Sequence, residues 1–156
     1  MSIFNYTEHI QLPITIDKAW SFFSSPLNLG KITPPHMNFI ITSGNGHVKT
    51  YQGQIITYKV SPLLGIQLNW CTEIAHVNEP HYFVDVQRKG PYKMWHHQHH
   101  FSPIANGVSM TDLLHYELPL GFLGNVMNHL FIKKEIEKIF SYRKQALIEI
   151  FGKYSG

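Results

Sequence analysis

The sequence is poor in cysteine, in charged residues and in long apolar runs, and each shortage excludes a class of protein. Cys71 is the only cysteine among 156 residues, so an intrachain disulfide is excluded and a reducing compartment fits. Charged residues make up 15% of the chain, with a net charge of +3 and no basic block of the kind that binds nucleic-acid phosphates. Without a run of about 18 apolar residues, we expect no stable membrane insertion.

Common catalytic and targeting motifs are missing as well. The sequence contains no glycine-rich phosphate loop, no nucleophile elbow and no Cys-x-x-Cys pair. Residues 1–6 show no basic region followed by an apolar run, so we expect no secretory signal and a cytoplasmic protein. A chain of 156 residues with 44% hydrophobic residues has the size of one domain, residues 1–156, with a substantial core.

Apolar periodicity predicts a β-rich region between helical segments. Residues 2–12 are expected to form a strand, Thr15 to cap a helix that begins at Ile16, and residues 27–32 to form a second short helix. A glycine-rich turn is expected at Gly44-Asn45-Gly46. Six further segments are rich in β-branched and aromatic residues, as is typical of consecutive antiparallel strands: 39–42, 54–60, 67–75, 82–87, 93–101 and 108–118.

The dipeptide Asn106-Gly107 predicts a tight hairpin, because a type I′ turn needs positive φ at both central positions. If these two residues form the turn, Ala105 pairs with Val108. The pairs that follow are Phe101 with Asp112, His99 with Leu114, and His97 with Tyr116.

After Pro119 a period of 3.6 residues predicts a long C-terminal helix. Arg143 lies inside its apolar stripe, which is unusual for a solvated charge. Leu123, Met127 and Phe131 form a second apolar face, so segment 121–131 is expected to be covered on two sides or to act as a flap. The stripe consists of Ile132, Ile136, Ile139, Phe140, Leu147, Ile150 and Phe151.

The most informative segment is the strand expected at residues 93–101. One of its faces carries Trp95, His97, His99 and Phe101, so two imidazoles lie between two aromatic rings. A plain apolar core does not need imidazoles, whereas a cavity with a few polar groups does. His96 and His100 belong to the opposite face, where we expect them to be exposed. The sequence therefore predicts a binding pocket.

Several phrases together resemble the SRPBCC superfamily, which includes START-type lipid-transfer domains, polyketide cyclases and dehydrases, and pathogenesis-related plant allergens. The resemblance is greatest to a bacterial branch of ligand-binding SRPBCC proteins and covers nearly the whole chain. The phrases are FVDVQ at 83–87, GPY at 90–92, Trp95 with His97, His99 and Phe101, MTD at 110–112, ELPLG at 117–121 and IFSYR at 139–143.

This resemblance implies an α+β helix-grip fold with a deep cavity. In that fold a curved antiparallel sheet of about seven strands wraps around the long C-terminal helix, and two short helices follow the first strand. The superfamily holds transporters, sensors and enzymes, so the resemblance implies no single reaction.

The polar residues of the expected pocket allow more than one interpretation. His97 and His99 with Asp112 could bind a metal, but residues two apart on a strand have parallel side chains and no third ligand is shown to converge, so we expect no metal and no cofactor. The same three residues are the candidates for acid–base catalysis. Asp85 could pair with Arg143, either to receive a ligand or merely to hold the helix on the sheet.

The leading hypothesis is that the protein binds a small hydrophobic or amphipathic molecule, for transport or sensing. The alternative is a polyketide cyclase-like or dehydratase-like enzyme with a pocket histidine as acid or base, and whether the protein is an enzyme is left open. A third hypothesis makes segment 121–131 a contact surface, with the oligomeric state unknown. The candidate ligand contacts are Trp70, Phe83, Asp85, Gln87, Trp95, His97, His99, Phe101, Met110, Asp112, Tyr116 and Arg143.

Overall fold

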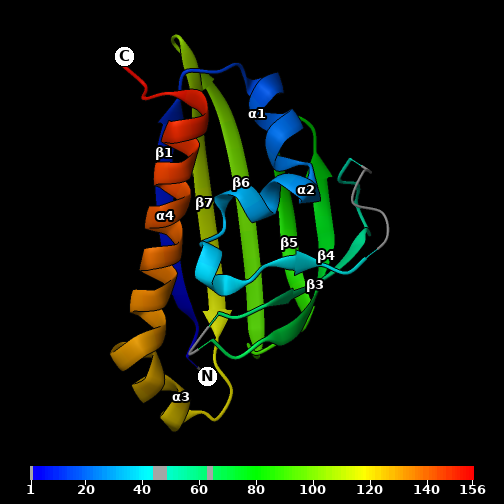
Figure 1. The fold of residues 1–156 in the computed structure, drawn as a ribbon, viewed down its shortest axis with the longest axis vertical. Helices are drawn as coiled ribbons and strands as arrows, with labels where there is room; N and C mark the ends of the chain where they lie inside the picture. The colour runs from blue at the N-terminus through cyan, green and yellow to red at the C-terminus, as the bar shows by residue number, and fades with distance from the viewer. Residues whose placement is uncertain (1, 44–48, 63–64) are drawn as a thin grey trace.

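The computed structural model describes residues 2–43, 49–62 and 65–156, so the turn expected at Gly44-Asn45-Gly46 lies outside the described residues. Within these ranges seven strands form one antiparallel sheet in the order β1-β7-β6-β5-β4-β3-β2 (Figure 1). The predicted α+β fold class is confirmed. The strands are β1 (Phe4–Leu12), β2 (Ile40–Ile41), β3 (Ile55–Val60), β4 (Leu68–Asn78), β5 (Tyr82–Lys89), β6 (Met94–Ile104) and β7 (Gly107–Glu117).

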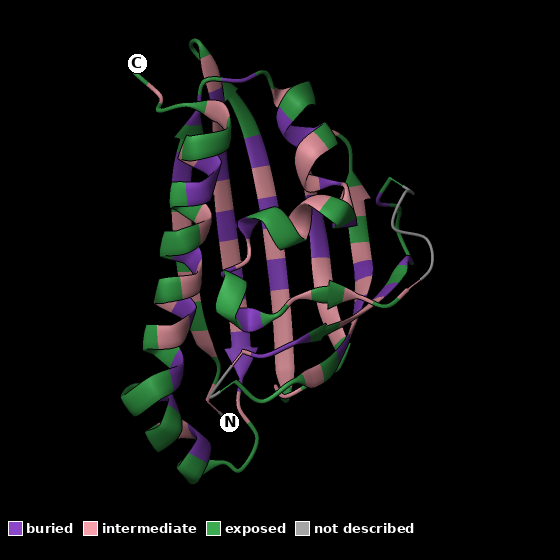
Figure 2. Ribbon diagram, viewed as in Figure 1, coloured by how far each residue is buried: buried purple, intermediate pink, exposed green. Residues whose placement is uncertain are grey.

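Burial alternates along the long central strands, because successive side chains point to opposite faces of the sheet (Figure 2). On β6 the buried residues are His97, His99 and Phe101, and on β7 they include Asp112 and Leu114. The predicted aromatic and imidazole face of β6 is therefore the face turned toward the helices. His96 and His100 lie on the other face and are half-buried rather than exposed.

The register of the β6–β7 hairpin differs from the prediction by two residues. Ile104 pairs with Gly107, so the loop residues are Ala105 and Asn106, and Asn106 has φ +56°. The observed pairs are Phe101 with Met110, His99 with Asp112, and His97 with Leu114. Gly107 is needed for a different reason: a Cβ there would collide with the carbonyl oxygen of Leu12 on the neighbouring strand β1.

The helices cover one face of the sheet, with α4 lying along β1 and α1 lying across β6 and β7 (Figure 1). Thr15 caps α1 as predicted, since its Oγ1 accepts a hydrogen bond from the Lys18 amide at 3.3 Å. The helical elements are α1 (Ile16–Phe23), α2 (Pro26–Leu29), the 3₁₀ turns η1 (Gly30–Ile32) and η2 (Pro35–Met37), α3 (Phe122–Met127), the π-helical turn η3 (Asn128–Ile132) and α4 (Lys133–Phe151).

Two apolar clusters hold α4 and α1 on the sheet. One joins Trp20 of α1 and Leu147 of α4 to Phe101 and Met110 of the sheet. The other joins Ile136 and Phe140 of α4 to Leu114 and Tyr116 of β7. Burial of these stripes, rather than helix propensity, stabilises the helices in place.

The place of Ile150 in the buried stripe is wrong, and so is one of the two alternatives for segment 121–131. Ile150 is 44% exposed, because the last turn of α4 packs on the core through Leu147, Ile148 and Phe151 and leaves Ile150 on its outer side. Leu123, Met127 and Phe131 are also exposed, at 56%, 36% and 52%, so α3 and η3 are not covered on two sides. In the described parts of the chain, no helix combines the length and apolarity needed to cross a bilayer.

Candidate functional site

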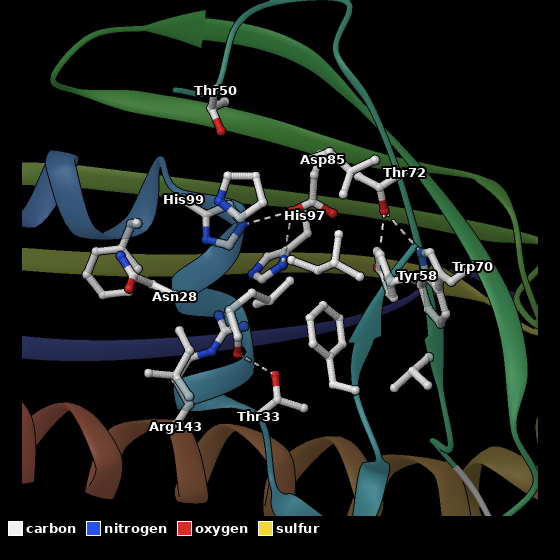
Figure 3. Close-up of a pocket in the computed structure, with 18 of the residues that line it drawn as sticks. Asn28, Thr33, Thr50, Tyr58, Trp70, Thr72, Asp85, His97, His99 and Arg143 are labelled. Atoms are coloured by element: carbon white, nitrogen blue, oxygen red, sulfur yellow. Dashed lines mark hydrogen bonds and ion pairs between the residues drawn. The ribbon is translucent and has the colours of Figure 1, made fainter. Parts of the chain in front are cut away.

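A cavity of about 170 Å³ lies between the concave face of the sheet, the α1–η2 segment and α4 (Figure 3). It is partly open to solvent, and most of its lining is apolar. The lining residues are Phe22, Phe23, Ser25, Pro26, Asn28, Leu29, Ile32, Thr33, Met37, Phe39, Ile41, Thr50, Ile56, Tyr58, Val60, Pro62, Trp70, Thr72, Ile74, Phe83, Asp85, Tyr92, Trp95, His97, His99, Ile139 and Arg143.

Stacked aromatic rings from three strands and a turn form one wall. Trp70 stacks on Tyr58 at 5.9 Å between ring centroids and meets Trp95 edge-on at 5.4 Å. Its indole Nε1 donates to Thr72 Oγ1 at 3.1 Å, and the Tyr58 hydroxyl lies 3.2 Å from the same oxygen. Because these polar atoms already have partners, the wall offers a ligand mainly apolar contact.

Next to this wall, on the same face of the sheet, lies a buried cluster of two imidazoles and two carboxylates. Asp112 Oδ1 lies 3.0 Å from His97 Nε2 and 2.7 Å from His99 Nδ1. Asp85 Oδ2 lies 2.8 Å from His99 Nε2 and 3.5 Å from His97 Nδ1. The two rings, 3.9 Å apart between centroids, therefore lie side by side between one carboxylate behind them and one at the cavity.

Strand pairing brings these four side chains together. Asp85 of β5 is opposite His97 of β6, and His99 is opposite Asp112 of β7. All four side chains lie on the helix-covered face of the sheet, because residues directly opposite each other on paired strands point to the same face. The cluster is thus a product of three adjacent strands and not of the His-x-His spacing alone.

Arg143 of α4 completes the cluster from the helix side. Its Nη1 lies 3.4 Å from Asp112 Oδ2, and its guanidinium carbon lies 5.1 Å from the centre of the Phe140 ring. Its partner is therefore Asp112, which corrects the Asp85–Arg143 pair considered from the sequence. The buried Nε of Arg143 has no hydrogen-bond partner within the described residues.

The pKa shifts follow from burial and from these contacts. Burial disfavours the charge on both carboxyls, but Arg143 and the imidazoles outweigh it, holding the pKa of Asp112 well below and that of Asp85 below the usual value. Burial lowers the pKa of His97, and the charge of His99 adds to that effect. For His99 the two carboxylates outweigh burial and raise the pKa.

The opposite directions make His99 the more basic and His97 the less basic of the two imidazoles. With a proton on His99, that imidazolium and Arg143 would balance the two carboxylates. A buried cluster with balanced charges avoids the cost of an isolated buried ion. Chemically it can accept or give a proton, orient a polar group of a ligand, or bind a cation.

The predicted ligand contacts divide into two groups. Trp70, Phe83, Asp85, Trp95, His97, His99 and Arg143 line the cavity. Among the described residues, Gln87, Phe101, Met110, Asp112 and Tyr116 are absent from the lining.

The second group has other partners. The Gln87 side chain donates to the Tyr92 carbonyl at 2.6 Å and accepts from the Tyr92 amide, so it closes the turn after β5. The Tyr116 hydroxyl donates to Asn128 Oδ1 at 2.8 Å. Phe101 and Met110 pack in the core with Trp20, and Asp112 lies behind the two histidines.

Sequence reasoning missed the part of the lining that comes from α1 to β3. Ile56, Tyr58 and Val60 alternate along β3 and could have been identified as one face of a strand. Phe22, Asn28 and Met37 give no such signal, because their approach to the sheet depends on how two short helices fold back. In Figure 3 the labelled Asn28 and Thr33 belong to this segment, across the cavity from the sheet.

No family model matches the chain, and no curated protein matches it either. Several solved structures do match the chain in fold. Protein CV1439 from Chromobacterium violaceum aligns with TM-score 0.71 and 10% identity over 96% of this chain and 99% of its own.

Two further structures have names that identify their type. A point mutant of norcoclaurine synthase from Thalictrum flavum, in complex with a transition-state analogue, aligns with TM-score 0.66 and 13% identity over 96% of each chain. Ara h 8.0201 aligns with TM-score 0.60 and 12% identity over 95% of this chain and 99% of its own. At such identities the likeness concerns the fold alone. The chain has the helix-grip fold of Bet v1-type and SRPBCC-type proteins.

Proposed function

We propose that this chain is a single-domain member of the ligand-binding branch of the SRPBCC superfamily and binds a small, mostly apolar molecule in its cavity. The observation that carries the proposal is the contrast within the lining: aromatic and aliphatic walls face one polar cluster. Such a cavity favours a ligand with an apolar body and one polar end. His99 and Asp85 would orient that end, while Trp70 and Trp95 contact the body.

The cavity volume suits a ligand with about one ring inside the cavity. An apolar protein cavity of about 150 Å³ holds benzene, so the 170 Å³ found here fits a substituted monocyclic molecule. Burying roughly 200 Å² of apolar ligand surface is worth about 5 kcal/mol before the entropy cost of association, so apolar contact alone gives a Kd of about 0.2 mM at best. A hydrogen bond between the ligand and the polar cluster lowers this Kd.

Filling the cavity from β3 is the direct test. We expect the Ile56→Trp variant to bind 4-fluorophenol at least 10-fold more weakly than the wild type, because Ile56 lines the cavity and the larger side chain occupies it. Binding is followed by ¹⁹F NMR titration in the presence of a chelator. The matched control is Ile55→Trp, on the same strand but 51% exposed, which should bind as the wild type does. Equal affinities in all three proteins would contradict the proposal.

The enzyme hypothesis keeps one observation in its favour, namely that two carboxylate-oriented imidazoles border the cavity. An enzyme of the cyclase or dehydratase type would use the neutral His97 as the base. His97→Gln would then abolish turnover of a substrate while affinity for it remained. A binding protein would show a changed affinity and no turnover in either form.

A further inference from the structure

We propose that Asp85, His97 and His99 form a binding site for a divalent transition-metal ion at the polar wall of the cavity. Each of the three residues offers one ligand atom, and these atoms all lie within 4.8 Å of one another. The sequence supplied the two histidines but proposed Asp112 as their partner. The structure assigns the third ligand to Asp85 and gives Asp112 a different role.

The distances suit a metal of the size of zinc. Asp85 Oδ2 is 2.8 Å from His99 Nε2 and 3.5 Å from His97 Nδ1. Nitrogen and oxygen ligands at about 2.0–2.1 Å in a tetrahedral site are separated by about 3.3 Å. Small side-chain rotations are therefore enough to place an ion between the three atoms. Because the strands fix the backbone, no rearrangement of the fold is needed.

Asp112 provides the strongest argument. The ring nitrogens that point away from Asp85, His97 Nε2 and His99 Nδ1, lie 3.0 Å and 2.7 Å from the same oxygen of Asp112. A metal-bound histidine almost always donates its second N–H to a carboxylate, a carbonyl or water, which fixes the tautomer and leaves the other nitrogen free to coordinate. Here Asp112, 3% exposed, forms this hydrogen bond with His97 Nε2 and lies within ion-pair distance of His99 Nδ1, which has no hydrogen-bond partner among the described residues.

The donor set and its surroundings indicate the class of ion. Two imidazoles and one carboxylate prefer Zn²⁺, Fe²⁺ or Co²⁺ to Mg²⁺ or Ca²⁺, which favour oxygen ligands. Arg143, which also lines the cavity, pairs with Asp112 at 3.4 Å, so Asp85 remains the carboxylate that faces the ion. Three protein ligands leave at least one coordination position, directed at the cavity, for water or for a polar group of a ligand.

The experiment uses the full chain without an affinity tag, treated with a chelator and dialysed before Co²⁺ is added. We expect one Co²⁺ per chain, with visible absorption bands of a low-coordinate site, and displacement of Co²⁺ by Zn²⁺ in calorimetry. Asp85→Asn and His99→Gln should each weaken binding more than about 100-fold, beyond the 10–100-fold that loss of an outer-shell partner costs. Should His99→Gln fail to fold, the half-buried Asp85 still provides the test.

His96→Gln and His100→Gln are the matched controls. Both residues lie on β6 next to the proposed ligands but on the other face of the sheet, so their loss should leave Co²⁺ binding unchanged. The inference is overturned if no stoichiometric binding occurs, if Asp85→Asn binds as the wild type does, or if the control variants lose binding equally. It does not depend on the proposed function, because the ion is titrated without an organic ligand and 4-fluorophenol is titrated with a chelator present.

Discussion

The Asp112→Asn variant is expected to lose about 3–5 kcal/mol of its free energy of unfolding. Asp112 is 3% exposed and faces three possible cations, His97, His99 and Arg143. Removing one partner of a buried charge cluster leaves the other charges uncompensated. The loss in stability is then larger than the net stability that the ion pair itself contributes. Asparagine preserves the shape of the side chain, so packing does not account for the loss.

The measurement is urea denaturation with a chelator present, at several pH values. Asp112 contributes stability above its unfolded pKa of 3.8, and that contribution is lost as the pH falls through the much lower folded value. His99 contributes below its unfolded pKa of 6.5 and loses its contribution as the pH rises through the raised folded value. The difference between the two proteins should therefore be largest between pH 3.8 and 6.5.

The Glu8→Gln variant is the control, since it removes a negative charge whose ion-pair partner, Lys144, is half exposed, while the glutamine oxygen can still accept from the Tyr6 hydroxyl. Exposed ion pairs are worth at most about 1 kcal/mol. If Asp112→Asn costs no more than Glu8→Gln, the cluster is not the desolvated, charge-balanced group described here.

Phe101→Ala is the second substitution with a large expected effect, a loss of about 3–5 kcal/mol in the free energy of unfolding. Phe101 is 2% exposed, and its ring meets Trp20 of α1 at 6.0 Å and Phe23 at 5.4 Å between centroids. Truncation leaves a void beneath α1 that the paired strands cannot close. The sequence placed Phe101 among the ligand contacts, whereas its position in the structure predicts a role in stability.

Chemical denaturation of Phe101→Ala is compared with that of Phe122→Ala. The substitution is the same, but Phe122 at the start of α3 is 83% exposed, so its loss should change stability by less than about 0.5 kcal/mol. Similar losses in both variants would mean that Phe101 does not anchor α1 on the sheet.

The strands and helices could be predicted because their signals are local. Alternation along residues 93–101 and 108–118 showed which residues share a face, and the 3.6-residue period after Pro119 predicted α4. Thr15 preceding an apolar helical pattern marked the start of α1. The likeness of its fold to solved structures confirms the helix-grip expectation, while the single domain and the cytoplasmic location stay predictions.

The local turn signal gave the wrong hairpin loop, because the glycine in it is needed for contact with a neighbouring strand. The dipeptide Asn106-Gly107 has the composition of a turn, but Gly107 is required by the close approach of Leu12 on β1, a strand almost a hundred residues away in sequence. The loop moved by one residue, from 106–107 to 105–106, so each residue's partner on the other strand moved by two and every side chain kept its predicted face. That parity is why the faces were right although the pairs were wrong.

The sequence by itself determined which imidazoles and aromatic rings share one face of β6, because strand geometry alone fixes that face. Only the tertiary structure decided that Asp85 lies at the cavity side of His97 and His99, that Asp112 lies behind them with Arg143, and that Gln87 closes a turn. These contacts depend on the register between three strands and on where α4 crosses them. Both result from packing across the whole chain, which no local pattern records.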